Sequence, residues 1–196
     1  MDEATTRAPG RPATIDAEAV ARVAMQLFAT KGYENTSMAD IARTAGIGRK
    51  SLYRYFATKA DLVWGGMEPA LHASLAALGT EGAGPFPAGD PLAGLRKSVA
   101  AGAAALPDFP LTRARLRLIA EHRELLNRSY DALAAQQGQA LTYLLAAGVP
   151  VDTARYVCAA FVAASFQAWL EWAAGTDGDP APYLQAATEI LRIPPT

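Results

Sequence analysis

The fold is decided by residues 36–59, which read TSMADIARTAGIGRKSLYRYFATK. Ser37 is of a type that caps helices, and Asp40 stands three positions later, as in a capping box. Gly46 follows where a sharp turn between helices needs a positive φ. Gly48 then opens another short helix that ends near Phe56. The stretch therefore predicts a helix-turn-helix.

The second helix of this motif carries side chains suited to duplex DNA. Leu52 and Phe56 share one face, four residues apart, and are expected in the core. The other faces hold residues able to reach phosphates and base edges, namely Arg49, Lys50, Ser51, Tyr53 and Arg54. Residues 41–60 contain five basic side chains and no acidic one. Such a local patch is sufficient to neutralise DNA phosphates, although the whole chain has a net charge of −1.

A wider stretch, residues 27–62, reads LFATKGYENTSMADIARTAGIGRKSLYRYFATKADL and resembles the DNA-binding domain of the TetR family of bacterial regulators. The matching motifs are LFxxKGY, TSM, AGIG, LYRYF and TKADL, in this order. They cover the first third of the chain, and the remainder is similar to the family in length and helical character only. Residues 63–71 (VWGGMEPAL) and 115–128 (RLRLIAEHRELLNR) are similar to actinobacterial members of the mycofactocin type.

The resemblance implies roles for individual residues of the motif. Base contacts are expected from Arg49, Lys50 and Ser51, and a thymine-methyl or phosphate contact from Tyr53. The full expected DNA-binding set is Thr36, Ser37, Gly48, Arg49, Lys50, Ser51, Tyr53, Arg54, Tyr55 and Lys59. Arg7 and Arg11 in the polar N-terminal arm are candidates for the minor groove, or ordinary surface residues.

Helical patterns extend over the rest of the 196 residues, and no segment has the pattern of a strand. We expect a first helix from a cap at Asp16 to about Lys31, a long helix over 58–78, a loop over 79–90, and further helices near 91–105, 110–121, 122–146, 152–174 and 180–192. The predicted fold is all-α: a flexible arm (1–13), a three-helix DNA-binding domain (14–57), and an effector-binding and dimerisation bundle (58–196).

The bundle is predicted to dimerise, as the resemblance implies. The helix over 152–174 is apolar nearly all round, so it needs cover on every face. A partner subunit is the expected cover, and a central position in a monomer is the alternative. The expected contact residues are Ala160, Ala164, Trp169 and Trp172.

The resemblance also implies an effector pocket, and the mycofactocin-like segments favour a large apolar effector. The candidate lining residues are Trp64, Met67, Leu71, Leu75, Leu116, Ile119, Tyr130, Leu133 and Phe161. An ordinary apolar core explains the same residues. Arg96, Arg113 and Arg117 are expected either to hold an anionic group or to lie on a solvated face.

Composition argues against other classes of protein. His72 and His122 lack metal-ligand spacing, so neither a metal nor a cofactor is predicted, and the absence of phosphate-loop and nucleophile motifs argues against an enzyme. The single cysteine, Cys158, is expected to be a buried inert thiol in a cytoplasmic protein. The N-terminus is polar rather than a signal sequence, and no segment is expected to span a membrane.

The sequence therefore predicts a homodimeric repressor that leaves a palindromic operator when it binds a small molecule. A DNA-binding activator or an effector-independent regulator is the alternative. A ligand-binding helical protein with a vestigial head is a third hypothesis from another class.

Overall fold

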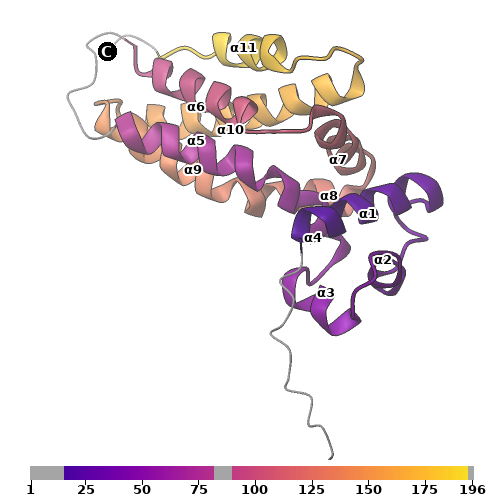
Figure 1. Cartoon of the computed structure of the whole chain (residues 1–196). Helices are drawn as coiled ribbons and strands as arrows, with labels where there is room; N and C mark the ends of the chain where they lie inside the picture. The colour runs from indigo at the N-terminus through magenta and orange to yellow at the C-terminus, as the bar shows by residue number, and fades with distance from the viewer. Residues whose placement is uncertain (1–15, 82–89, 194–196) are drawn as a thin grey trace, which may run out of the picture. The chain divides into compact units, whose positions relative to one another are not determined.

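The computed structural model describes residues 16–81 and 90–193, and every regular element within these two ranges is a helix (Figure 1). Contacts between Cα atoms divide the chain after Thr58 into two compact units, residues 1–58 and 59–196. We call the first unit the head and the second the body. The division lies one residue from the predicted domain boundary.

The head consists of α1 (Ala17–Lys31), α2 (Met38–Thr44) and α3 (Arg49–Tyr55). The predicted limits of α1 are confirmed: the Asp16 carboxylate accepts from the backbone N–H of Ala19 (3.0 Å), and the helix ends at Gly32 with φ 85°. Phe28 of α1, Ile41 of α2 and Leu52 of α3 are buried, and α2 is in contact with both α1 and α3. This apolar centre fixes the angle at which α2 and α3 are held.

The turn between α2 and α3 has the backbone geometry that the sequence predicts. Gly46 has φ 68°, a conformation that costs other residues energy because of their Cβ atom. Its N–H donates to the Arg43 carbonyl oxygen (3.2 Å), and the Ile47 N–H donates to that of Ala42 (3.0 Å). These bonds satisfy carbonyl groups that the end of α2 would otherwise leave unpaired.

The body is a helical bundle. Its elements are α4 (Lys59–Trp64), the 3₁₀ helix η1 (Gly65–Met67), α5 (Glu68–Glu81), α6 (Leu92–Ala104), α7 (Phe109–Glu121), α8 (Arg123–Asn127), α9 (Ser129–Ala146), α10 (Val151–Ala174) and α11 (Ala181–Glu189). Figure 1 shows α5, α6, α9 and α10 running side by side, with α11 against α6 and α10. A buried apolar cluster, which includes Leu95, Leu144 and Phe161, fills the space between them.

The long helix predicted over 58–78 is interrupted by η1, so that prediction is wrong. Gly65 and Gly66 are poor helix formers, and Pro69 has no N–H to donate to Gly65, four residues earlier. The Glu68 N–H donates to the Gly65 carbonyl oxygen instead, which tightens this turn. A side chain at Gly66 would overlap the buried Arg115 guanidinium, because the added Cβ would lie 1.9 Å from Arg115 Cζ. The interruption therefore makes room for this arginine.

The single helix predicted over 122–146 is also wrong, because it is divided into α8 and α9 at Arg128. The backbone N–H of Arg128 donates to the Leu125 carbonyl oxygen, three residues earlier, rather than continuing the α-helical pattern. The Arg128 guanidinium forms an ion pair with Asp61 on α4. A contact with a distant helix thus accompanies the break, and no local sequence pattern encodes it.

Only one side of α10 is covered by the described part of its own chain. Ala154, Phe161 and Trp172 have no exposed surface, whereas Tyr156 is 78% exposed. By length and composition alone, α10 is long enough and apolar enough to cross a membrane. This is weak evidence for a span, because core helices of helical bundles meet the same criteria.

Candidate nucleic-acid interface

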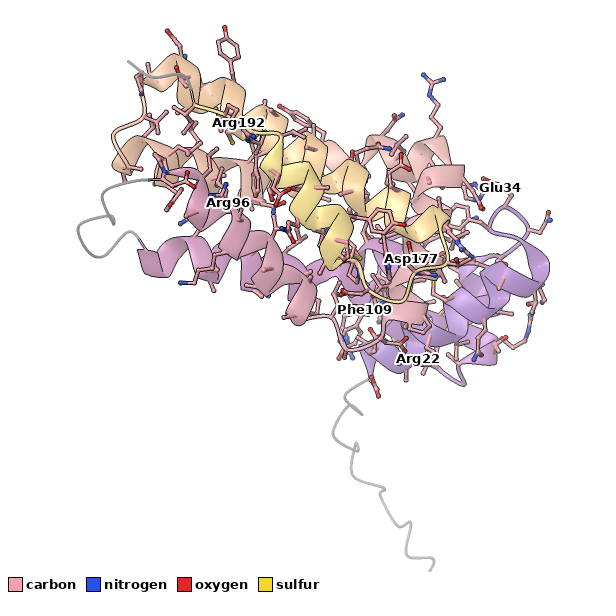
Figure 2. The ribbon with its side chains drawn as sticks, turned by 90° about the horizontal axis from the view of Figure 1, so that it is seen from above. Arg22, Glu34, Arg96, Phe109, Asp177 and Arg192 are labelled. Carbon is pink, nitrogen blue, oxygen red and sulfur yellow. The ribbon has the colours of Figure 1, made fainter. Side chains whose placement is uncertain are left out.

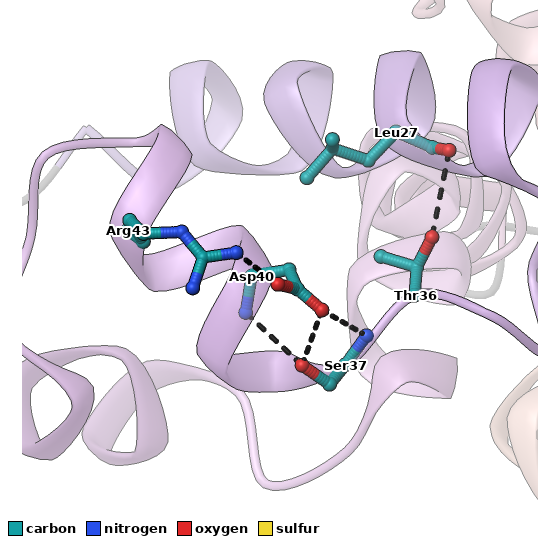
Figure 3. A network of polar contacts seen from close by, with 5 residues as sticks. All are labelled: Leu27, Thr36, Ser37, Asp40 and Arg43. Atoms are coloured by element: carbon teal, nitrogen blue, oxygen red, sulfur yellow. Dashed lines mark hydrogen bonds and ion pairs between the residues drawn. The ribbon is translucent and has the colours of Figure 1, made fainter.

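The start of α2 is fixed by reciprocal hydrogen bonds between Ser37 and Asp40 (Figure 3). The Asp40 N–H donates to the Ser37 hydroxyl (3.1 Å), while the Ser37 hydroxyl (2.5 Å) and N–H (3.1 Å) donate to the Asp40 carboxylate. Mainly through the hydroxyl bond, this environment lowers the pKa of Asp40 from 3.8 to about 2. Arg43 also pairs with this carboxylate. The predicted capping box is confirmed.

Thr36 differs from its neighbour in being buried. It is 1% exposed, and its hydroxyl donates to the Gly32 carbonyl oxygen at 2.8 Å, with that of Leu27 at 3.4 Å (Figure 3). Its hydrogen-bonding capacity is therefore used to tie the end of α1 to the start of α2. The expectation of a phosphate contact from Thr36 does not fit this geometry, whereas Ser37 is exposed.

The helix α3 presents the predicted side chains on its surface. Leu52 is buried, and Arg49, Lys50 and Arg54 are exposed. Tyr53 is 52% exposed, so its ring and hydroxyl are accessible to a partner. Basic groups and an aromatic ring therefore share one exposed helix.

Three further predicted residues, Gly48, Ser51 and Tyr55, lie in α3 or at its N-cap. Ser51 is half-buried in the helix, and Gly48 is exposed at the N-cap. Tyr55 is 41% exposed, and the Arg54 guanidinium lies 5.1 Å from its ring centroid. This cation–π contact limits the positions that Arg54 can occupy.

The other predicted DNA contacts lie outside this helix. Lys59 is half-buried at the first position of α4, in the body. Arg7 and Arg11 lie outside the described residues. The candidate interface of the head is therefore the start of α2 together with α3.

The body contains a cavity of about 50 Å³ among α4–α7, α9 and α10. The predicted residues that line it are Trp64, Met67, Leu71, Leu116 and Leu133. The predicted residues that do not line it are Leu75, Ile119, Tyr130 and Phe161. Ile119 and Phe161 are fully buried in the core, and Tyr130 is 76% exposed.

The prediction missed the polar part of the cavity lining. Ser74, Gln136 and Ser165 are buried and contribute to its wall. Ser165 was visible in the sequence only as a polar interruption of the apolar run in α10. Its position in the cavity wall depends on how α10 packs against the other helices, which the apolar run alone does not predict.

Two arginines of α7 have a structural role that differs from both predicted ones. Arg117 Nε donates to the Ala173 carbonyl oxygen (2.7 Å), and Arg113 and Arg117 both donate to that of Gly175. The Arg113 guanidinium also lies 4.4 Å from the ring centroid of Trp172. These arginines satisfy carbonyl groups at the end of α10, which carries a partial negative charge. Their guanidinium groups are therefore engaged within the fold rather than directed only to solvent.

The segment that follows α10 is held by hydrogen bonds from Trp172 and Tyr183. Figure 2 labels Phe109 and Asp177, which lie beside these side chains. Trp172 Nε1 donates to the Asp177 carbonyl oxygen (2.9 Å), and the Phe109 ring lies edge-on to Trp172, 5.7 Å away. Tyr183 donates to the Asp177 carboxylate, which raises the pKa of Tyr183. Trp172 is therefore an internal anchor with 0% exposure, unavailable for the predicted contact with a partner.

Arg96 and Cys158 of the body also have defined surroundings. Arg96 pairs with Asp90 at the start of α6. Cys158 is buried, its Sγ lies 3.0 Å from the Gln137 carbonyl oxygen, and burial raises the pKa of its thiol. Because a raised pKa keeps the thiol protonated, this environment suits the predicted inert cysteine.

Comparison with known proteins places the head in a family. Residues 21–63 match the family described as bacterial regulatory proteins, tetR family. A protein described as a mycofactocin biosynthesis transcriptional regulator, MftR of Mycobacterium tuberculosis, is 43% identical over 56 residues, 29% of this chain and 28% of that protein. The HTH-type regulator YezE of Bacillus subtilis is 36% identical over 69 residues, 35% of this chain and 36% of that protein. The matches thus span about a third or less of these relatives.

Solved structures extend the similarity of fold to the body. The TetR-family regulator PfmR of Thermus thermophilus has 21% identity and a TM-score of 0.51 over 87% of this chain and 95% of that one. A tetR-family regulatory protein of Rhodococcus has 20% identity and a TM-score of 0.53 over 93% of this chain and all of that one. At such identities, the comparison establishes the fold alone.

Fold and site together define a class: a helix-turn-helix head joined to an all-helical body. Within that class, the matched domain, its motif order and the fold of the whole chain agree. Residues 21–63 of the head match the TetR family of bacterial regulatory proteins, and the chain shares its fold with solved TetR-family regulators.

Proposed function

We propose that this protein is a homodimeric transcriptional repressor that binds a palindromic operator through α3 and is released by a small molecule bound in the body. The observation that carries the proposal is the exposed surface of α3, where Arg49, Lys50 and Tyr53 project from a rigid helix-turn-helix. Arginine, lysine and short polar side chains on such a helix can form hydrogen bonds with base edges in the major groove. The start of α2 is exposed at Ser37, and the positive end of the helix there is suited to a phosphate.

Dimerisation is supported by an apolar row on α10 and by an exposed isoleucine directly after α11. On α10, Tyr156, Ala160 and Ala164 follow one another at four-residue spacing, so they lie on one side. Tyr156 is 78% exposed, Ala160 is exposed and Ala164 is half-buried, and Ile190, which directly follows α11, is 70% exposed. Small residues beside large exposed ones suit close packing against another helix. We therefore assign Tyr156, Ala160 and Ala164 to the dimer face, and we omit the buried Trp172 and also Trp169, which lines the cavity.

Release by a small molecule is supported by the cavity in the body. Trp64 of α4 and Met67 of η1 line it, so an occupant of the cavity would touch the segment that continues from the head. The relative MftR, described as a regulator of mycofactocin biosynthesis, suggests control of a biosynthetic gene set for this chain also.

The DNA-binding role is tested with duplexes selected from a random-sequence library by the wild-type protein. Lys50→Ala and Tyr53→Ala are expected to weaken binding to the selected duplex by about 1–3 kcal/mol each. Lys97→Ala, an exposed position on α6, is the matched control and should leave affinity unchanged. Wild-type affinity should fall as salt rises. Unchanged affinity in both α3 variants would refute the assignment of the recognition helix.

A further inference from the structure

The internal cavity of the body contains one polar group that has no partner in the described part of the chain. Ser165 of α10 is 5% exposed, and its buried Oγ makes no hydrogen bond there. The other serine in the wall, Ser74 of α5, donates to the Ser98 carbonyl oxygen at 2.8 Å. Of the two serine hydroxyls in the wall, that of Ser74 is hydrogen-bonded within the fold, whereas that of Ser165 is not. Leaving a buried hydroxyl unpaired is unfavourable, so Ser165 has hydrogen-bonding capacity to offer an occupant.

A second polar group lies in the same wall. Gln136 of α9 is 8% exposed, and its primary amide can both donate and accept. Among the residues that line the cavity, none has an ionisable acidic or basic side chain. An ionised ligand would therefore lose its hydration without gaining a counter-charge. The lining favours a neutral molecule with a hydrogen-bonding group.

The size of the cavity limits what can enter it unchanged. Its volume is about 50 Å³, whereas a buried apolar cavity that holds benzene measures about 150 Å³. Leu133 and Phe166 line this cavity and also a surface groove of about 520 Å³ between α9 and α10. These two side chains are therefore a common wall, and displacing Phe166 would join the two spaces.

Phe166 is also in contact with α4. Its ring stacks on that of Trp64 with 6.0 Å between centroids and 27° between planes. Trp64 is held in addition by a hydrogen bond from its Nε1 to the Leu125 carbonyl oxygen (3.2 Å). A ligand that displaces Phe166 would therefore remove the stacking partner of an α4 side chain.

We propose that the cavity and the adjoining groove form one site for a neutral, elongated molecule with a single hydrogen-bonding end. The polar end lies at Ser165 and Gln136, and the apolar body passes Phe166 into the groove beside Val162 and Leu170. Val162 and Phe166 of the groove lie on a different side of α10 from the row of Tyr156, Ala160 and Ala164 assigned to the dimer, whereas Gln167, at the edge of the groove, lies beside that row. This inference rests on the proposed effector response and names its ligand class.

The test uses three six-carbon probes that differ at one end: 1-hexanol, 1-chlorohexane and hexanoate. Binding is followed by tryptophan fluorescence, because Trp64 and Trp169 line the cavity. The wild-type protein should bind 1-hexanol more tightly than 1-chlorohexane. Hexanoate should bind at least roughly tenfold more weakly than 1-hexanol. Equal binding of hexanoate, or no binding of any probe at millimolar concentration, would overturn the proposal.

Two serine variants separate a ligand contact from a structural role. Ser165→Ala should reduce the preference for 1-hexanol over 1-chlorohexane by roughly three- to tenfold, the value of one hydrogen bond, without lowering the melting temperature of the free protein. Ser74→Ala should keep the preference and lower the melting temperature, because its hydroxyl bonds within the fold. An unchanged preference in Ser165→Ala would refute the polar end at this residue.

Phe166→Ala tests the joined site. It should shift the tightest-binding alcohol from 1-hexanol toward 1-octanol and 1-decanol, because the wall between cavity and groove is removed. An unchanged optimum would refute the path into the groove. All these measurements are made without DNA, so they are independent of operator binding. If 1-hexanol binds as expected but leaves operator affinity unchanged, the ligand site stands and the proposed release fails.

Discussion

Ser37 and Asp40 allow the stability of the head to be tested at the scale of single residues. Ser37→Ala removes the cap of α2 and should lower the free energy of unfolding by about 1 kcal/mol near neutral pH. The Asp40 pKa of about 2 is below the reference value of 3.8, so the ionised form is stabilised by folding. That stabilisation is present above about pH 4 and is lost as the pH falls toward 2.

Chemical denaturation from pH 6 to pH 2 checks this prediction. The difference in unfolding free energy between wild type and Ser37→Ala should be constant above pH 4 and should narrow below it. The higher-pH points serve as the internal control, since Asp40 is ionised there in both folded proteins. A difference that stays constant down to pH 2 would contradict the account of the capping box.

At the scale of elements, the close packing of α5 on α6 depends on Gly102. A Cβ at this position would lie 2.6 Å from Ser74 Oγ and 3.0 Å from the Ala70 carbonyl oxygen. Gly102→Ala should therefore lower the free energy of unfolding by about 1–3 kcal/mol, because a backbone atom cannot move aside cheaply. Denaturant unfolding monitored by circular dichroism measures the change.

The matched control is the same substitution in the middle of another helix. Gly138 is exposed in α9, and an added Cβ would meet no atom within 4 Å. Gly138→Ala should raise the free energy of unfolding by up to about 1 kcal/mol through helix propensity alone. Stabilisation by both substitutions would show that α5 and α6 can separate to admit a methyl group.

The elements also show what the sequence can and cannot predict. Asp16, Ser37 and Gly46 act through neighbours in the chain, so the limits of α1 and the turn after α2 were predicted from local patterns. The break after Trp64 accommodates Arg115, which lies far along the chain, and no local pattern announces that contact.

The same distinction applies to the candidate sites. Exposure of Lys50 and Tyr53 followed from the position of Leu52 on the opposite face of a short helix. Burial of Thr36 and Trp172, by contrast, depends on which other helices pack over them. Ser165 belongs to the second kind, since its role as a cavity wall depends on the packing of α10 within the body.

At the scale of the whole molecule, the affinity for an operator depends on both the charge of the head and the oligomeric state. Residues 1–63 contain 9 basic and 7 acidic side chains, whereas residues 64–196 contain 9 and 12. The basic excess of the first part is small, so one copy offers few phosphate contacts. Two heads spaced about 34–36 Å apart would meet successive major grooves and roughly double those contacts. Tight operator binding is therefore expected to require the dimer.

Ala160→Arg tests that requirement by placing a long charged side chain in the apolar row on α10. The variant should be a monomer by multi-angle light scattering, because burying an unpaired charge in a helix interface is strongly unfavourable. Its affinity for a palindromic duplex should fall to that for a half-site, whereas wild type should bind the palindrome at least roughly a hundredfold more tightly, as linked binding sites do.

Ala114→Arg supplies the matched control, since Ala114 is an exposed alanine in the middle of α7, outside the assigned dimer face. It should remain a dimer with wild-type operator affinity. If Ala160→Arg stays dimeric, then the copies associate through another surface. If it becomes a monomer yet keeps its affinity for the palindrome, then each head binds independently and the second copy contributes nothing to operator recognition.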